Sequence, residues 1–158
     1  ENLELKDASA GVYTSLDPVL SSLPASFSQL AALKELALRG SFVRLPEVVG
    51  ALPTLRRLNL AGSESMTSLC DSLPPTLEAL SLSQCSALRS LPEAFSSLVC
   101  LQEANFLGCV ELASLPDVSA LTELTRLDLR LCFALQSLPS GLMDLHGCCV
   151  YLPVDEGV

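Results

Sequence analysis

The sequence predicts an α/β repeat solenoid: a right-handed arc with a parallel sheet on its concave face and short 3₁₀ or α turns and loops on its convex face. Three observations lead to this prediction. One pattern of 22–24 residues recurs five times in residues 33–147, leucines alternate with other residues inside each copy, and a Leu-Pro pair follows in four of the five copies. Recurrence at such a period is the signature of stacked repeat architectures.

The five copies begin at Leu33, Leu55, Leu77, Leu101 and Leu124, so their starts are 22, 22, 24 and 23 residues apart. They share the pattern L-x-x-L-x-L-x-x-(C/S)-x-x-L-x-x-L-P, which a looser apolar tail follows. Each copy predicts one coil of the solenoid. A single coil cannot enclose its own leucines, whereas stacked coils share one continuous core.

Each L-x-L triplet predicts a short strand. Side chains alternate between the two faces of a strand, so the leucines point inward and the residues between them point outward. Stacked coils then pair their strands in parallel, about 4.8 Å apart. The outward residues of all coils therefore form one surface on the concave face.

The Leu-Pro pairs predict where each coil turns back on the convex side. They occur as Leu45-Pro46, Leu91-Pro92, Leu115-Pro116 and Leu138-Pro139, while the second copy has Leu69-Cys70 in that place. Proline fixes φ and donates no backbone hydrogen bond, so long helices are not expected there. Short 3₁₀ or one-turn helices are expected instead.

The 158 residues predict a single domain with irregular ends. Residues 1–32 form an irregular first coil, in which Leu3-Glu4-Leu5 reads as a strand and residues 7–20 as an inserted loop or short helix. Residues 33–147 hold the five regular repeats, and residues 148–158 a last strand and an acidic tail. The start has neither an initiator Met nor a cap, so we expect a segment upstream of it.

The charge balance argues against two classes of partner. The chain has 9 basic and 18 acidic residues and a formal net charge of −9. Nucleic acid and anionic membranes both require a basic footprint, so neither is expected as a partner. No apolar run is long enough to span a bilayer, and the start lacks the features of a signal peptide. We expect a monomer whose partner is a protein.

The cysteines predict free thiols. Seven are present, an odd number, and the chain has no N-x-Ser/Thr sequon. This combination favours a reducing intracellular compartment, cytoplasmic or nuclear. There is no C-x-x-C pair, and His146 is the only histidine, so no metal site is predicted.

One position of the pattern carries a column of Ser and Cys: Ser41, Ser63, Cys85, Cys109 and Cys132. We interpret it as a column of small core residues whose hydroxyl or thiol serves the backbone of the turn. A column of metal-binding or bridged thiols is the alternative. Only His146 could act as a base for a nucleophilic Ser or Cys, and it lies outside the strand register at the far end. No phosphate-binding glycine loop is present, so neither an enzyme nor a cofactor is predicted.

The pattern resembles the leucine-rich repeat family, and the resemblance covers Leu33 to about Gly147 in five copies. Repeats with Cys or Ser in the middle and Leu-Pro after it look like those of intracellular plant immune receptors and of bacterial type III effectors. The resemblance implies a horseshoe fold and a protein-binding role. It also implies a setting inside the cell, which would be the host cytoplasm for a bacterial effector.

The outward strand positions are the predicted partner-binding surface. Basic residues are scarce in the chain, yet four arginines fall on this face, and Arg and Tyr are favoured in protein interfaces. Pairs such as Arg39 with Glu35, or Arg126 with Asp128, are equally explained as ordinary surface ion pairs. The predicted contact residues are Glu35, Arg39, Arg57, Asn59, Ser81, Ser83, Glu103, Asn105, Arg126, Asp128, Arg130 and Tyr151.

Two functions fit this surface. The first is a noncatalytic interaction module that binds a protein on its concave face. The second is the substrate-recognition arm of a larger protein, such as a ubiquitin-ligase effector or an immune receptor.

Overall fold

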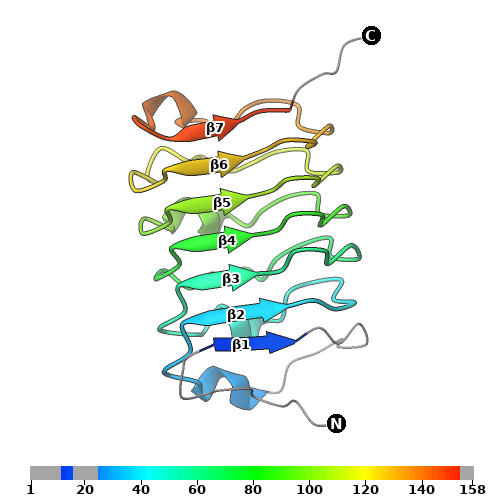
Figure 1. Ribbon diagram of the computed structural model, residues 1–158, viewed down its shortest axis with the longest axis vertical. Coiled ribbons are helices and arrows are strands. Elements are labelled where there is room, and N and C mark those ends of the chain that lie inside the picture. Colours follow the sequence, from blue (N-terminus) through cyan, green and yellow to red (C-terminus); the bar gives the residue numbers. More distant parts are fainter. Residues whose placement is uncertain (1–11, 16–24, 154–158) are drawn as a thin grey trace.

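The computed structural model describes residues 12–15 and 25–153. They form a stack of coils, and a single sheet runs along one side of the stack (Figure 1). The seven strands are parallel and follow chain order. The predicted parallel-sheet solenoid is confirmed. The solvent-facing side of the sheet, which the sequence predicts to be concave, is called the sheet face below. The strands are β1 Val12–Ser15, β2 Glu35–Leu38, β3 Arg57–Asn59, β4 Ala79–Ser81, β5 Glu103–Asn105, β6 Arg126–Asp128 and β7 Cys149–Tyr151.

The strands pair in the register that the repeat alignment predicts. Leu36 of β2 lies beside Leu58 of β3, which lies beside Leu80 of β4. The same row continues through Ala104 of β5 and Leu127 of β6. Each inward position therefore meets its own equivalent in the next coil, and one core runs the length of the stack.

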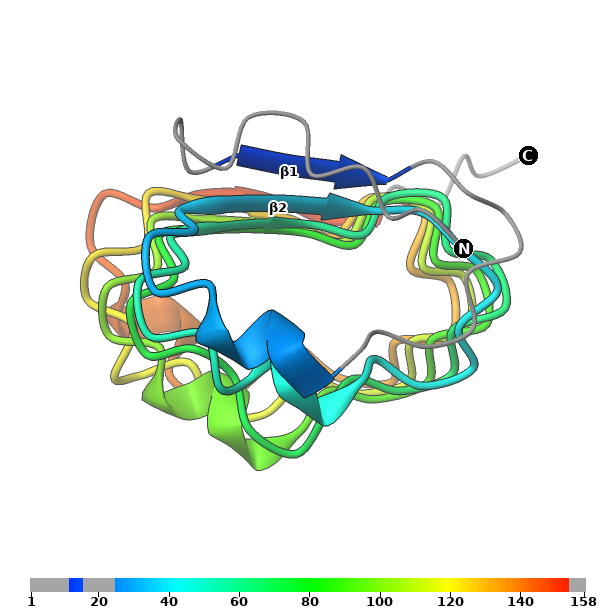
Figure 2. The ribbon, with the colours of Figure 1, turned by 90° about the horizontal axis from the view of Figure 1, so that it is seen from below.

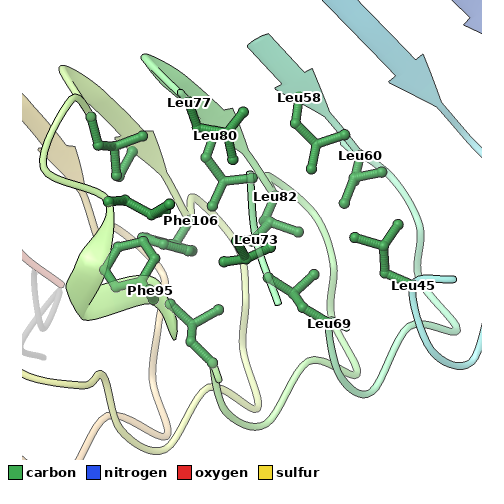
Figure 3. Close-up of a cluster of buried hydrophobic side chains, with 14 of the residues drawn as sticks. Leu45, Leu58, Leu60, Leu69, Leu73, Leu77, Leu80, Leu82, Phe95 and Phe106 are labelled. Atoms are coloured by element: carbon green, nitrogen blue, oxygen red, sulfur yellow. The ribbon is translucent and has the colours of Figure 1, made fainter. Parts of the chain in front are cut away.

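The inward leucines fill the space between the sheet and the opposite side of the coils. Leu80 and Leu82 of one coil are fully buried, and Figure 3 shows them among leucines of the neighbouring coils. Two aromatic rings complete this part of the core, because Phe95 and Phe106 pack edge to face with centroids 5.9 Å apart. Burial of one such leucine contributes about 1.5–3 kcal/mol, which stacking secures for every coil.

Short 3₁₀ helices lie on the side of the stack opposite the sheet, although not in every coil (Figure 2). They are η1 Ala25–Gln29, η2 Glu47–Val49, η3 Glu93–Ser97 and η4 Leu142–Asp144. Both η2 and η3 begin directly after the proline of a Leu-Pro pair, where Pro46 and Pro92 are extended. The predicted short turns are confirmed, and all helices of the described residues are of this 3₁₀ type.

The structure corrects the first coil. Residues 7–20 were expected to form a loop or short helix, but Val12–Ser15 is strand β1 and pairs along the whole of β2. The prediction is wrong for these four residues. They lack the leucine pattern, yet V-Y-T-S consists largely of β-branched and aromatic types, which suit a strand beside the open edge of β2. The strand predicted at Leu3-Glu4-Leu5 lies outside the described residues.

The turn after the strand passes through a left-handed residue in four successive coils. These residues are Gly62, Gln84, Gly108 and Leu131, with φ of 76°, 62°, 76° and 61°. Glycine adopts this conformation freely, whereas an L side chain raises its energy by about 1–2 kcal/mol. The turn brings the next residue, the Ser or Cys of the pattern, back into the core.

Candidate functional site

The twelve predicted contact residues all lie on, or directly after, strands β2 to β7. Eleven of them are exposed or half-buried on the sheet face. Asp128 differs, since only 1% of its surface is exposed. The prediction that Asp128 contacts a partner is therefore wrong, because a buried carboxylate has no surface to offer.

Cations gather on the sheet face. The chain has 9 Lys and Arg, of which Lys6 lies outside the described residues and leaves eight. Four of these eight, Arg39, Arg57, Arg126 and Arg130, stand on or just after the strands. The sheet face is thus richer in positive charge than a chain of net charge −9 would suggest.

Three outward polar residues have a backbone role that the sequence prediction missed. The side-chain oxygen of Asn59, Asn105 or Asp128 accepts a hydrogen bond from the backbone N–H two residues later, at 3.0, 3.0 and 3.2 Å. Such a bond supports the turn that ends the strand. The recurrence of Asn or Asp between the two inward residues of the strand is the signal that could have revealed it.

Asp128 also holds Arg130 in place. Nε of Arg130 donates to Oδ1 at 3.0 Å and Nη2 donates to Oδ2 at 2.7 Å, so the contact is bidentate. These hydrogen bonds lower the pKa of the Asp128 carboxyl from its usual value, although burial opposes the change. The carboxylate therefore stays charged at neutral pH and fixes the guanidinium of Arg130, whose side chain remains 42% exposed.

Tyr151 of β7 joins the two arginines of β6 and the following turn. The guanidinium carbon of Arg126 lies 5.3 Å from the centre of the Tyr151 ring, and that of Arg130 lies 5.2 Å from it. Both distances fall within the range of cation–π attraction. The structure thus brings Arg126, Arg130 and Tyr151 into one cluster, which is called the arginine cluster below.

The other end of the sheet face is looser. Arg57 approaches Glu35 of the preceding strand, with Nε and Oε1 3.8 Å apart, and the side chains of Arg57 and Glu35 are 66% and 46% exposed. Arg39 lies over the next coil, since a Cβ added to Gly62 would be 3.0 Å from Arg39 Nε. Neither arginine has a hydrogen bond to a buried carboxylate among the described residues.

The middle of the sheet face is small and nearly uncharged. Ala79, Ser81 and Ser83 are half-buried there. Glu103 of β5 is exposed and stands beside Arg126 in the strand register. The two charged ends are therefore separated by a strip of short side chains.

The Cys column is structural. Each of three thiols donates a hydrogen bond to a carbonyl oxygen of the preceding coil: from Cys85 to Leu60 at 3.3 Å, from Cys109 to Leu82 at 3.1 Å, and from Cys132 to Phe106 at 3.2 Å. Burial raises the pKa of Cys85 and Cys132 to about 11, and it also raises the pKa of Cys109. The thiols stay protonated at neutral pH, so they can donate these bonds and are poor nucleophiles.

The first two members of the column differ from the rest. Ser63 is buried, and its hydroxyl has no hydrogen-bond partner among the described residues. Ser41 is exposed, while the adjacent Phe42 is buried in the core. Ser41 does not belong to the column, because only seven residue steps separate Leu38 from Leu45 and no room remains to turn Ser41 inward.

The sequence prediction also missed an apolar surface beside the arginine cluster. Val110, Leu131 and Phe133 expose 39%, 43% and 62% of their surface, and Leu107 is half-buried. Ala134 N donates to Val110 O at 3.1 Å, so Phe133 and Val110 stand in adjacent coils. These four residues are called the apolar edge below. The signal that could have revealed it is the change from Glu64 and Ser86 to Val110 and Phe133 at one repeat position.

Two further features of the described residues bear on function. Residues 12–15 and 25–153 include no group of three His, Cys, Asp or Glu side chains placed to hold a metal ion. In the same ranges no helix has the length and apolar character needed to cross a membrane.

Known proteins provide the comparison for this fold. No family model matches the chain. The structure of the leucine-rich repeat domain of the type III effector XopL matches it with a TM-score of 0.66 and 28% sequence identity. The match covers 84% of this chain and 57% of that domain. The chain has the leucine-rich repeat fold.

A sequence relative points the same way. The disease resistance protein RML1B of Arabidopsis thaliana is 38% identical over 72 residues, which are 46% of this chain and 7% of the relative. The resemblance to effector and plant immune-receptor repeats is therefore confirmed. This leucine-rich repeat chain spans 57% of the effector domain and a small part of the resistance protein, and both likenesses agree with a protein-interaction module.

Proposed function

We propose that this leucine-rich repeat chain is a noncatalytic interaction module that binds a protein partner through its sheet face. The observation that supports this most is the arginine cluster, in which two of the scarce cations and a tyrosine lie together on an open sheet. Arg and Tyr are enriched among the residues that dominate binding energies. Open solenoids also offer extended surfaces to partners.

The fixed geometry of the cluster supports the same function. Asp128 and Tyr151 restrict Arg130, so little side-chain freedom is lost when a partner binds. Arg126 contacts the Tyr151 ring, and no ion pair of Arg126 is found in the part of the chain that the structure describes. Its hydrogen-bonding edge is therefore available to a carboxylate or carbonyl group of a partner.

The test compares two charge reversals that change the net charge equally. Arg126→Glu alters the sheet face, whereas Arg89→Glu alters an exposed arginine that is paired with Glu111 away from the strands. Both variants and the wild-type chain are used as bait for affinity capture, with quantitative mass spectrometry of the bound proteins. We expect Arg126→Glu to lose the specific partner and Arg89→Glu to retain it.

Thermal unfolding of both variants serves as the folding control. Equal capture of the same proteins by wild type and Arg126→Glu would contradict binding through the sheet face. Loss of the captured partner with both variants would indicate a nonspecific effect of charge and would also contradict binding through the sheet face.

The second candidate function is that of the recognition arm of a longer protein. The fraction of each relative that the match covers supports this candidate. The matching segment is 7% of a disease resistance protein, and the effector domain is longer than this chain. Sequencing of the complete transcript tests this candidate. A ubiquitin-ligase or nucleotide-binding domain encoded beside these repeats supports a recognition arm, and its absence favours a free-standing module.

We place the module in a reducing compartment inside a cell. All seven cysteines are free, and Cys85, Cys109 and Cys132 act as protonated hydrogen-bond donors. A tagged full-length protein seen by microscopy only outside cells would contradict this location.

A further inference from the structure

The apolar edge is confined to two coils. Continuation of the β5–β6 register by two residues places Leu107 beside Arg130, so the edge begins where the arginine cluster ends. Val110 and Phe133 follow in the adjacent turns. The equivalent positions of the two coils before them are occupied by Glu64 and Ser86, which are polar. No general requirement of the repeat therefore explains the exposed apolar side chains.

Leu131 adds a second, independent observation. It has a φ of 61°, a conformation that two of the four equivalent positions assign to glycine. A leucine there strains the backbone and leaves 43% of its surface exposed, so it serves neither the turn nor the core. Backbone strain that a glycine would avoid is concentrated at functional sites in many proteins.

We propose that the apolar edge and the arginine cluster together bind one extended segment of a partner protein, in which an apolar side chain lies next to an acidic one. The apolar side chain covers Leu131 and Phe133, and the carboxylate meets Arg126. This inference rests on the proposed function, because it extends the same surface and names the chemistry of the partner.

The arginine cluster is the reason that we propose an acidic segment. A chain of net charge −9 repels acidic segments over most of its surface, so such a segment is attracted only where cations gather. At this end the carboxylate of Asp128 is buried and bonded to Arg130, so it does not face a partner, whereas the guanidinium groups of Arg126 and Arg130 do. Glu103, beside Arg126, is an exposed carboxylate that opposes such a partner. Its removal is therefore expected to strengthen binding.

The experiment uses a phage library of random twelve-residue peptides selected on the full wild-type chain. Enriched peptides are synthesised with a fluorophore, and their dissociation constants are measured by fluorescence polarisation. We expect sequences that combine Leu or Phe with Asp or Glu. Phe133→Ser is expected to weaken binding about tenfold, as loss of an interface anchor does, and Glu103→Gln to strengthen it about twofold.

Leu131→Gly separates binding from folding. It is expected to weaken peptide binding at an unchanged or higher melting temperature, because glycine relieves the strained φ. Val43→Ser is the matched control, since Val43 has the same exposed fraction as Phe133, 62%, but lies near the other end of the stack. Binding to Val43→Ser should equal that of the wild type.

The outcomes separate this inference from the proposed function. Enriched peptides without acidic residues, no enrichment at all, or binding unaffected by Phe133→Ser and Leu131→Gly would overturn the inference. If Arg126→Glu nevertheless abolishes capture of the protein partner, the proposed function stands without it. A wild-type dimer in light scattering that Phe133→Ser dissociates would assign the edge to a second copy and would also overturn the inference.

Discussion

The two ends of the sheet face carry similar residues in different physical states. Near β2 and β3, Arg57 and Glu35 are both exposed and stand 3.8 Å apart. Near β6 and β7, Arg130 makes two hydrogen bonds to the buried Asp128, and its guanidinium carbon lies 5.2 Å from the centre of the Tyr151 ring. The first pair is free to rearrange in solvent, whereas the second is fixed before any partner arrives.

This difference teaches that residue type alone does not define a binding site on a solenoid. An exposed ion pair has little energy and loses side-chain freedom when a partner orders it. A guanidinium that is hydrogen-bonded to a buried carboxylate is already fixed in one orientation before the partner binds. We therefore assign the larger share of partner affinity to the β6–β7 end.

The largest expected effect comes from the buried carboxylate. Asp128→Ala removes the partner of Arg130 and the acceptor for its backbone N–H, so we expect a loss of about 1.5–3 kcal/mol in the free energy of unfolding. Urea denaturation at pH 7 measures it. Glu35→Ala, the matched change at the other end, should cost less than about 0.5 kcal/mol. Equal losses at the two ends would remove the contrast.

The same contrast predicts a pH dependence. The pKa of Asp128 is lowered in the folded protein, so its stabilising contribution is present above the unfolded value of about 4 and is lost as pH falls through the folded value. Wild type should therefore lose stability more steeply than Asp128→Asn between about pH 5 and pH 2. Urea denaturation at several pH values measures both curves. Parallel curves for wild type and Asp128→Asn would count against a charge-stabilising role.

Most of the fold could be predicted from the sequence, because the repeat fixes it. The L-x-L triplets determine which residues face inward, and the spacing of the copies determines the strand register. Strand β1 could not be predicted this way, since Val12–Ser15 depends on the neighbouring β2 rather than on a pattern of its own. The short turn after β2, which excludes Ser41, likewise depends on a local deletion of two residues.

The site was predicted less completely. Alternation correctly assigned Arg126 and Tyr151 to the sheet face, but it cannot distinguish an outward residue that is exposed from one that is covered. Asp128 is buried because Arg130 folds back onto it and Tyr151 lies beside it on β7. The left-handed φ of Leu131 is equally hidden, because the pattern permits any residue at that position.

Substitution of Tyr151 tests the β6–β7 end of the sheet face, with a smaller expected effect. Tyr151→Leu keeps apolar bulk on β7 but removes the ring that faces both guanidinium groups, so we expect a loss of about 0.5–1 kcal/mol. Tyr151→Phe should be close to wild type, since the ring rather than the hydroxyl makes the contact. Urea denaturation measures both variants, and faster NMR relaxation of the Arg126 side chain in Tyr151→Leu would report the lost restraint. An equal loss in Tyr151→Phe would attribute the effect to the hydroxyl.

The smallest expected effect lies at the loose end. A double-mutant cycle of Glu35→Ala and Arg57→Ala should give a coupling energy below about 0.5 kcal/mol, because both side chains remain in contact with water. The corresponding cycle of Asp128 and Arg130 should give a clearly larger value. A Glu35–Arg57 coupling above about 1 kcal/mol would mean that this pair is as well fixed as the arginine cluster. Preorganisation would then no longer distinguish the two ends, and partner affinity would have to be assigned to the whole sheet face.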